Sequence, residues 1–205
     1  MDASYTAQLN QQFAIVTKIA AMTEGWSKVK SLGSSTLFTR KYENYDLVLA
    51  KIETITDAKF ESCVKYFNED FEAQHKSKDN SDFIQEIEKV DATTRVIQFK
   101  FKGKLMVSAR DFLCVQQIRD LPNNGKIIIK ANLADHAKQV KNDAVRGECI
   151  VNGNILTRID GTDKTKIESY YLLDPVGNIP ATFVNTQIEK HLETQEKALS
   201  FIKKY

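Results

Sequence analysis

The chain has 205 residues, 42% hydrophobic and 27% charged, an ordinary composition for a soluble globular protein with a sizeable core. Its 29 Lys and Arg residues almost balance 27 Asp and Glu residues, which argues against nucleic acid as a partner because phosphate binding needs a concentrated basic surface. Cys63, Cys114 and Cys149 are odd in number and far apart, which excludes a disulfide framework or a CxxC motif and indicates buried, reduced thiols.

The sequence contains no signal-peptide pattern and no apolar run of the length that spans a bilayer. Together with the reduced cysteines, these features predict a cytoplasmic protein. We expect residues 1–205 to form a single domain and a monomer, since no linker or repeat divides the chain.

Residues 1–24 are predicted to form an N-terminal helix, because Leu9, Phe13, Val16 and Ile19 recur on one helical face. The other face is rich in Gln and Thr rather than in basic residues. This pattern favours a helix packed on its own domain over a membrane anchor.

Residues 26–174 change to the period of strands, with turn-like breaks between the apolar runs. They predict an antiparallel sheet of about nine strands in an α+β fold. Residues 145–159 are expected to form one continuous strand. Residues 57–80 return to helical spacing and predict a helical insertion after the third strand, with Asp57 as a plausible N-cap.

The C-terminal end is the most strongly patterned stretch. Tyr170–Leu173 is predicted to be a strand, and Asp174–Gly177 has the residues of a type I turn. Pro180 then suits the first position of a helix over residues 180–204. The apolar positions of this segment have helical spacing, so one helix of about seven turns is expected to lie across the sheet.

A sheet of this size curls, and a single helix over its open side can enclose more space than the side chains fill. Several strands present a strongly apolar face, formed by Ile97, Phe99, Phe101, Ile127, Ile129, Ala131, Leu133, Ile150 and Ile155. Gln116 is the polar exception on the neighbouring strand, beside Phe112 and Cys114. It is either satisfied by protein groups or reserved for the polar group of a ligand. Plain core packing remains the alternative to a cavity, since periodicity does not separate the two.

Three short stretches then resemble one family. Residues 108–112 (Ser-Ala-Arg-Asp-Phe) resemble the Arg-Asp-Phe signature of START (steroidogenic acute regulatory related lipid transfer) domains, and residues 144–146 (Ala-Val-Arg) resemble their Val-Arg element. Residues 170–180 resemble the strand, Asp-Pro-x-Gly turn and Pro that precede the terminal helix, and Trp26 also fits. The order and spacing hold over nearly the whole chain, and Tyr170 to Pro175 is most similar to the phosphatidylcholine-transfer branch.

This resemblance implies a helix-grip fold, a curved antiparallel sheet wrapped around a long C-terminal helix, with one lipid in a hydrophobic tunnel between them. It also implies that the C-terminal helix and the loop over residues 102–109 act as a lid. Family members carry or sense phospholipids, sterols or ceramides. We therefore expect lipid transfer with transient contact to membrane surfaces.

The residues expected to contact the lipid come from the central strands and the C-terminal helix. Arg110, Gln116 and Tyr170 are the expected polar contacts. The expected walls are Phe99, Phe101, Met106, Phe112, Cys114, Val184, Ile188 and Leu192. Alternatives stay open: Arg110 and Asp111 suit a structural ion pair that holds the loop after Gly103 better than they suit head-group binding, and only one of Tyr170 and Tyr171 can face inward from a strand.

The chain departs from the family pattern at two places. Residues 72–76 stand where many members have an Arg-x-x-Trp-Asp run, and Gln116 stands where the sterol-carrying branch has a buried Arg. A polar, uncharged Gln suits hydroxyl, amide or ester groups. We therefore favour a phospholipid over a sterol or a ceramide.

Motifs for catalysis and metal binding are missing from the sequence. His75, His136 and His191 are scattered without metal-ligand spacing, and no G-x-S-x-G nucleophile elbow occurs. We expect no cofactor, no metal and no enzymatic activity. The alternatives are an enzyme of the same superfold that acts on a bound hydrophobic substrate, and a lipid sensor or interaction module that does not transfer lipid.

Overall fold

Ten strands form one curved sheet in the computed structural model, which describes residues 3–104 and 107–204. The strands are β1 (Ser27–Leu32), β2 (Ser35–Lys41), β3 (Val48–Thr56), β4 (Ser81–Lys89), β5 (Thr94–Phe101), β6 (Arg110–Leu121), β7 (Gly125–Asn132), β8 (Val145–Arg146), β9 (Glu148–Arg158) and β10 (Thr165–Asp174). Their order is β1-β2-β3-β10-β9-β7-β6-β5-β4, all antiparallel, while the short β8 pairs parallel with β6.

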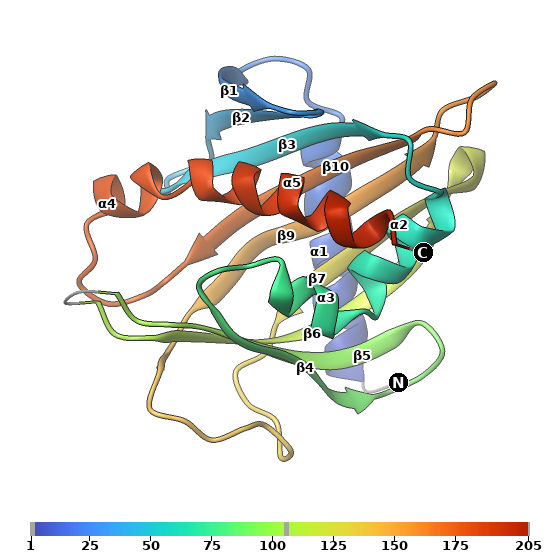
Figure 1. Cartoon of the computed structure of the whole chain (residues 1–205). Helices are drawn as coiled ribbons and strands as arrows, with labels where there is room; N and C mark the ends of the chain where they lie inside the picture. The colour runs from blue at the N-terminus through green and yellow to red at the C-terminus, as the bar shows by residue number, and fades with distance from the viewer. Residues whose placement is uncertain (1–2, 105–106, 205) are drawn as a thin grey trace.

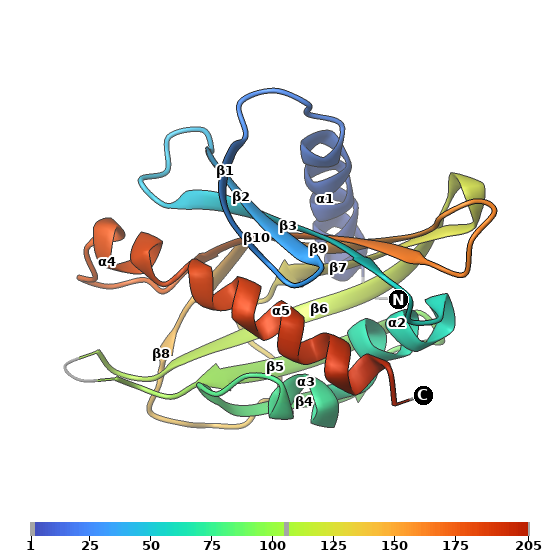
Figure 2. The same cartoon turned by 45° about the horizontal axis from the view of Figure 1, so that its top comes forward.

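The helices cover the two faces of this sheet unequally. They are α1 (Ala3–Ala20), α2 (Phe60–Asn68), α3 (Phe71–Lys76), the 3₁₀ turn η1 (Pro122–Asn124), α4 (Ala181–Thr186) and α5 (Glu189–Ile202). Helix α1 lies across one face, whereas α5 runs over the concave face, with α2 and α3 beside it (Figures 1 and 2). This arrangement confirms the α+β helix-grip fold.

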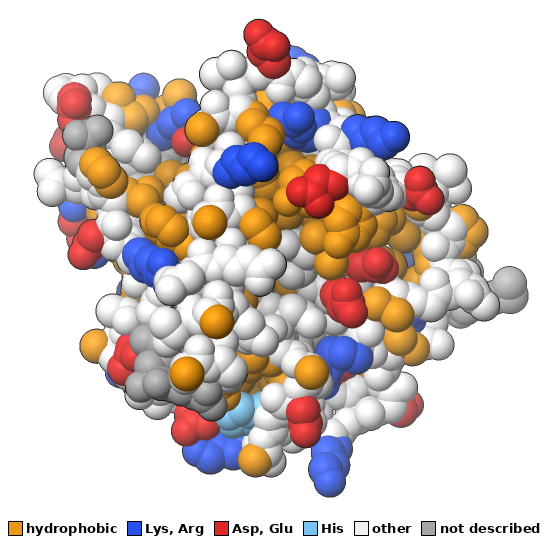
Figure 3. Space-filling view, turned by 180° about the vertical axis from the view of Figure 1, so that it is seen from behind, with side chains coloured by type: hydrophobic (Ala, Val, Ile, Leu, Met, Phe, Trp, Pro, Cys, Tyr) orange, Lys and Arg blue, Asp and Glu red, His pale blue; other side chains and the backbone are white. Residues whose placement is uncertain are grey.

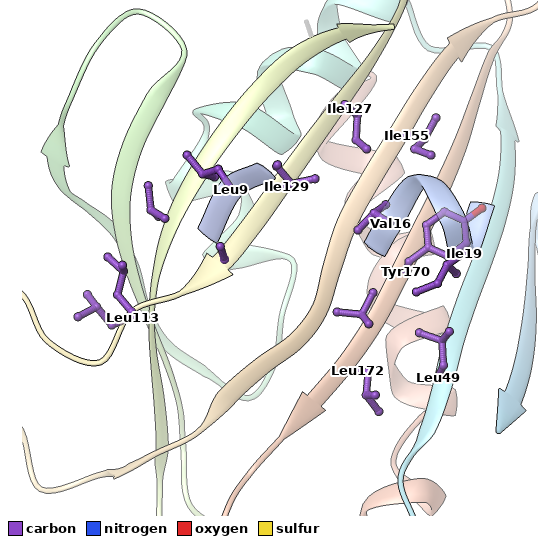
Figure 4. Packing of buried hydrophobic residues seen from close by; sticks show 14 of the residues in the cluster. Leu9, Val16, Ile19, Leu49, Leu113, Ile127, Ile129, Ile155, Tyr170 and Leu172 are labelled. Carbon is purple, nitrogen blue, oxygen red and sulfur yellow. The ribbon is translucent and has the colours of Figure 1, made fainter. Parts of the chain in front are cut away.

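The α1 face is a filled core. Leu9, Val16 and Ile19 of α1 pack on alternate residues of the central strands, such as Ile127 and Ile129 (Figure 4). Gly153 of β9 allows this close approach, because a Cβ there would lie 2.8 Å from Val16 Cγ1. Seen from the α1 side, acidic and basic side chains are interspersed on the surface (Figure 3).

The apolar residues predicted to share one face of the strands therefore lie on two different faces of the sheet. Residues Ile127, Ile129, Ala131, Leu133 and Ile155 belong to the cluster beneath α1, whereas Ile97 and Phe99 belong to a separate cluster with Phe112. Strand alternation identifies which residues share a side of their own strand. It does not identify which sides of different strands point the same way.

The predicted continuous strand over 145–159 is interrupted at Gly147. Residues 145–146 pair with β6 as β8, the Gly147 N–H donates to Asp111 O at 2.8 Å, and β9 begins at Glu148. The helical insertion after the third strand is present as α2 and α3. Asp57 does not cap α2, because its carboxylate pairs with Lys203 at 2.6 Å instead.

The predicted C-terminal helix is broken into α4 and α5. The turn between them, at Gln187 and Ile188, is held by bonds of the i to i−3 type, from Gln187 N to Val184 O and from Ile188 N to Asn185 O. The turn before α4 is not type I either, since Val176 has a φ of 54° and a type I turn requires negative φ there.

Candidate functional site

A cavity of about 610 Å³ lies between the concave face of the sheet and helices α4 and α5. Strands β5, β6, β7, β9 and β10 form its floor, and α3 and its following turn form one side. Six of the predicted site residues line it: Phe99, Phe101, Arg110, Phe112, Val184 and Ile188.

Three phenylalanines form the apolar wall of the cavity. The rings of Phe99 and Phe112 stack at 5.0 Å with an interplanar angle of 11°, and Phe101 meets both edge-on at 5.7 and 5.9 Å. Gly147 leaves room for the Phe112 ring, because a Cβ at this position would lie 2.5 Å from Phe112 Cε1. This wall offers an acyl chain a surface without polar groups.

Arg110 ties together the two loops that flank one end of the cavity. Its guanidinium donates to the Ser108 carbonyl at 2.7 Å, to the Pro175 carbonyl at 2.5 Å and to the Val176 carbonyl at 3.2 Å. It thus links the β5–β6 loop to the β10–α4 loop.

The alternative of an Arg110–Asp111 ion pair is wrong. The Asp111 carboxylate is buried and pairs with Arg146 at 3.0 Å, and it also accepts a hydrogen bond from Gln98 Nε2 at 2.8 Å. Successive residues of a strand point to opposite faces, so Arg110 and Asp111 cannot meet.

Polar side chains line the other part of the cavity. Tyr171 of β10 stacks on His191 of α5, with ring centroids 5.5 Å apart, and its hydroxyl donates to Asn154 Oδ1 at 3.3 Å. Burial raises the pKa of Tyr171. Burial, and secondarily the charge of Lys78, lowers the pKa of His191 to about 4, so its imidazole is neutral near pH 7.

Two lysines also line this polar part. Lys130 comes from β7, near its C-terminal end, and Lys78 comes from the turn after α3, where its Nζ donates to Gln74 O at 3.1 Å. Burial, then repulsion from Lys130, lowers the pKa of Lys78 to about 7, and burial also lowers the pKa of Lys130. Within the described residues, neither lysine forms an ion pair with a carboxylate.

Tyr170 does not line the cavity. It is 1% exposed and packs with Val16 and Ile19 beneath α1, so its neighbour Tyr171 takes the inward position (Figure 4). The prediction chose the wrong member of the pair because both orientations fit the same strand pattern.

Gln116 is held by protein groups rather than facing the cavity. Its Nε2 donates to the Asn68 carbonyl at 2.7 Å, at the end of α2, and the residue is 0% exposed. Its Oε1 has no hydrogen-bond partner among the described residues. The amide nitrogen of Gln116 is therefore hydrogen-bonded by the protein itself, which was the first of the two alternatives, and not reserved for a ligand.

Two further predicted wall residues lie off the cavity, and a third falls outside the described residues. Cys114 is buried behind Phe112, with its sulfur 3.3 Å from that of Cys149, and Leu192 packs on Leu37 and Ile52 of the sheet. Met106 lies outside the described residues, so its predicted role stays a prediction.

The prediction missed Lys78, Lys130, His191 and Asn152 as lining residues. One signal for Lys130 was present, a single lysine inside the apolar run Ile127-Ile128-Ile129-Lys130-Ala131. The others carry no local signal, because they meet only when α3, α5 and the sheet are assembled. No group of three His, Cys, Asp or Glu side chains in the described chain is arranged to hold a metal ion.

Comparison with known proteins decides the family. A family model described as START domain matches residues 7–198. The chain belongs to the START domain family. START domains typically bind and transfer lipids. No curated protein sequence matches the chain at a significant level.

Solved structures of START proteins share the fold. Human StAR-related lipid transfer protein 5 superposes with a TM-score of 0.79 at 16% identity, covering 97% of this chain and 96% of its own. Human STARD10 gives 0.81 at 18% identity, covering 95% and 80%. A STAR-related lipid transfer protein fragment from Xanthomonas axonopodis gives 0.75 at 17% identity, covering 88% and 99%. No helix in the described ranges is long and apolar enough to cross a membrane.

Proposed function

We propose that this START domain binds one lipid with its acyl chains in the cavity and carries it between membranes. The observation that carries the proposal is the cavity of about 610 Å³, with an aromatic wall on one side and a confined polar patch on the other. Ligand sites in proteins have this volume range and this combination of apolar walls with few polar groups.

The energetics favour a carrier. A two-chain lipid has roughly 30 methylenes, each contributing about 0.8 kcal/mol when it leaves water, so spontaneous desorption faces a barrier on the order of 25 kcal/mol. The bilayer and the cavity both keep the acyl chains of the lipid out of water. The protein therefore accelerates transfer by replacing the water-exposed intermediate with a protein-bound one.

The entrance lies at the end of the cavity formed by α4 and the β5–β6 loop. Helix α4 contains no buried residue, and Phe183 on it is 42% exposed while lining the cavity. Lys102, Lys104 and Lys190 also line the cavity near these segments. An exposed aromatic ring beside basic groups suits brief insertion at an anionic membrane surface.

Helix α4 is the proposed moving lid. Asn185 fastens it to the start of β3, accepting from Val48 N and donating to Asp46 O, both at 3.1 Å. The turn at Gln187 and Ile188 separates α4 from α5 and can absorb the change in backbone angles when α4 swings out.

The polar groups of this cavity favour a phospholipid over a sterol. Its polar patch includes two amines, an imidazole and amide groups, more hydrogen-bonding capacity than a sterol hydroxyl can use. Buried polar groups left without partners weaken binding of a ligand that cannot satisfy them.

The test is transfer of fluorescent phospholipid between donor and acceptor vesicles by a protein whose cavity is filled. Thr194 of α5 lines the cavity, and Thr194→Trp places an indole where methylenes would lie. Displacing two or three methylenes should slow transfer about tenfold or more.

Ser200→Trp is the matched control, since Ser200 lies on the same helix and is exposed. This variant should transfer lipid at the wild-type rate. Equal transfer by Thr194→Trp and Ser200→Trp would remove the cavity from the transfer mechanism. Recovery of chemically altered lipid from the vesicles would instead support an enzyme.

A further inference from the structure

A polar band crosses the concave face of the sheet beneath α5. In the strand register, Gln116 of β6 lies opposite Lys130 of β7, and Asn152 of β9 lies opposite Tyr171 of β10. The pair Ile129–Gly153 brings the next residues, Lys130 and Asn152, to neighbouring positions. Four adjacent strands therefore each contribute one polar side chain to a single row.

A second set of polar groups faces this row from the helices. Lys78 follows α3, while His191 and Gln195 come from α5, and all three line the cavity with Lys130 and Asn152. Lys78 and Lys130 are close enough for the charge of Lys130 to lower the pKa of Lys78, and Lys78 in turn lowers that of His191. The helices and the sheet thus surround one small space with basic groups.

The positive charge of this space is not neutralised from within. Two carboxylates line the cavity, Asp79 and Glu193, and both residues are exposed. Asp79 is already paired with Lys197 at 2.5 Å. Lys78 donates to a neutral carbonyl and Lys130 has no carboxylate partner in the described chain, so two amines line the same cavity without a neutralising carboxylate of their own.

Two amide side chains that line the cavity each have one polar atom without a partner. Asn152 and Gln195 are each 4% exposed, and neither Asn152 Oδ1 nor Gln195 Nε2 has a hydrogen-bond partner among the described residues. Buried polar groups in folded proteins are nearly always paired, so each such group needs an explanation. A ligand group that brings hydrogen-bonding atoms into the space supplies one.

We propose that the lipid head group is anionic, a phosphate or a carboxylate, and that it lies between Lys78, Lys130 and the amide nitrogen of Gln195. This inference rests on the proposed lipid-binding function and narrows its substrate class. The oxygens of such a group accept from ammonium and amide donors, and charge-assisted hydrogen bonds of this kind are the strong ones. One anion also removes the repulsion between the two lysines.

A neutral or zwitterionic head group fits less well. Diacylglycerol supplies hydroxyl and ester groups without charge, which leaves the lysines uncompensated. Choline brings a cation, which would lie near two further cations with only exposed Asp79 and Glu193 to offset it. Selectivity should therefore follow head-group charge rather than acyl-chain length.

The test measures which lipid the protein extracts from a mixture. Vesicles contain phosphatidic acid, phosphatidylcholine and diacylglycerol in equal amounts, all with oleoyl chains, and mass spectrometry quantifies the lipid bound after re-isolation of the protein. Wild type should enrich phosphatidic acid over diacylglycerol roughly tenfold, as expected for hydrogen bonds to a charged group. A second mixture of oleic acid and oleyl alcohol tests the carboxylate.

Lys130→Met and Lys78→Met should each lose most of this enrichment. We expect these variants to fold, because each one removes a half-buried amine that has no carboxylate partner in the described chain and keeps an unbranched side chain. Lys126→Met is the matched control: Lys126 lies on the same strand, is paired with Asp120 and does not line the cavity, so enrichment should be unchanged.

The outcomes separate this inference from the proposed function. If wild type extracts the lipids in the proportions of the vesicle, the anionic head group is overturned while lipid binding stands. Enrichment of phosphatidic acid that both lysine variants retain has the same consequence. Protein that extracts no lipid overturns both proposals. Added inorganic phosphate should leave bound phosphatidic acid in place. Loss of the enrichment would assign the lysines to a free anion and overturn the proposal.

Discussion

Replacing Lys78 by methionine should stabilise the protein in a way that depends on pH. The Lys78 amine lies in the interior without a carboxylate partner, and burial lowers its pKa from 10.5 to about 7. Folding therefore opposes the charged form of this side chain. Methionine has a similar length and flexibility and carries no charge.

The magnitude follows from the pKa. A fall from 10.5 to about 7 corresponds to roughly 5 kcal/mol against the charged form, at about 1.4 kcal/mol per pKa unit. Lys78 is partly accessible through the cavity and donates to Gln74 O, which both reduce the penalty. We expect Lys78→Met to gain about 1–3 kcal/mol near pH 6 in the lipid-free protein.

The sign of the pH dependence is fixed by which state binds more protons. Between about pH 7 and 10.5 the unfolded chain keeps the Lys78 proton and the folded protein has lost it, so this residue makes wild-type stability rise with pH. The penalty is complete below about pH 7 and disappears towards pH 10.5. The advantage of Lys78→Met should shrink over the same range.

Urea unfolding followed by circular dichroism measures this difference near pH 6 and near pH 10. Lys126→Met is the control, since its ion pair with Asp120 lies away from the cavity. A Lys78→Met protein that is less stable than wild type near pH 6, or whose advantage is the same at both pH values, would refute the reasoning.

Two further variants test the wall and the entrance. Gly147→Ala should destabilise the protein by about 1–3 kcal/mol in urea unfolding, because its Cβ would lie 2.5 Å from Phe112 Cε1 and 2.9 Å from the Asp174 carbonyl; a neutral effect would mean that the ring moves freely. Arg110→Met removes the bonds to Pro175 and Val176 and should speed release of bound lipid roughly tenfold in a stopped-flow assay, and unchanged release would exclude Arg110 from holding the entrance.

Much of the fold could be predicted from the sequence because local patterns decide it. Period-two alternation and turn residues place the strands, and the amphipathic pattern of residues 1–24 places α1. The break at Gly147 was hidden, because the residues on both sides continue to read as a strand. Its cause is distant in sequence, namely the contacts of Gly147 with Asp111 and the Phe112 ring.

The site was only partly predictable because it depends on which side of each strand faces the cavity. Tyr170 and Tyr171 fit the strand equally well, and only the position of α1 assigns Tyr170 to the core. Gln116 was expected to meet the ligand, but the end of α2 supplies a carbonyl to it. Lys78 and Lys130 are 52 positions apart in sequence, and their proximity is a property of the assembled sheet and helices.

The break between α4 and α5 also has a physical reason that periodicity does not report. Apolar residues recur at helical spacing through Val184, Ile188 and Leu192, so the sequence reads as one helix. In the structure, Asn185 holds α4 to the start of β3 while Leu192 packs on β2 and β3 through Leu37 and Ile52. The two anchors lie on either side of the turn at Ile188.

Native mass spectrometry of the protein after incubation with the mixed oleoyl vesicles tests the central claim most directly, that the space beneath α5 holds a lipid. The account predicts a 23.3 kDa chain that carries one intact lipid, and a Thr194→Trp chain of which a clearly smaller fraction carries lipid. A wild-type chain that emerges without lipid, or a Thr194→Trp chain that retains it equally well, would contradict the account.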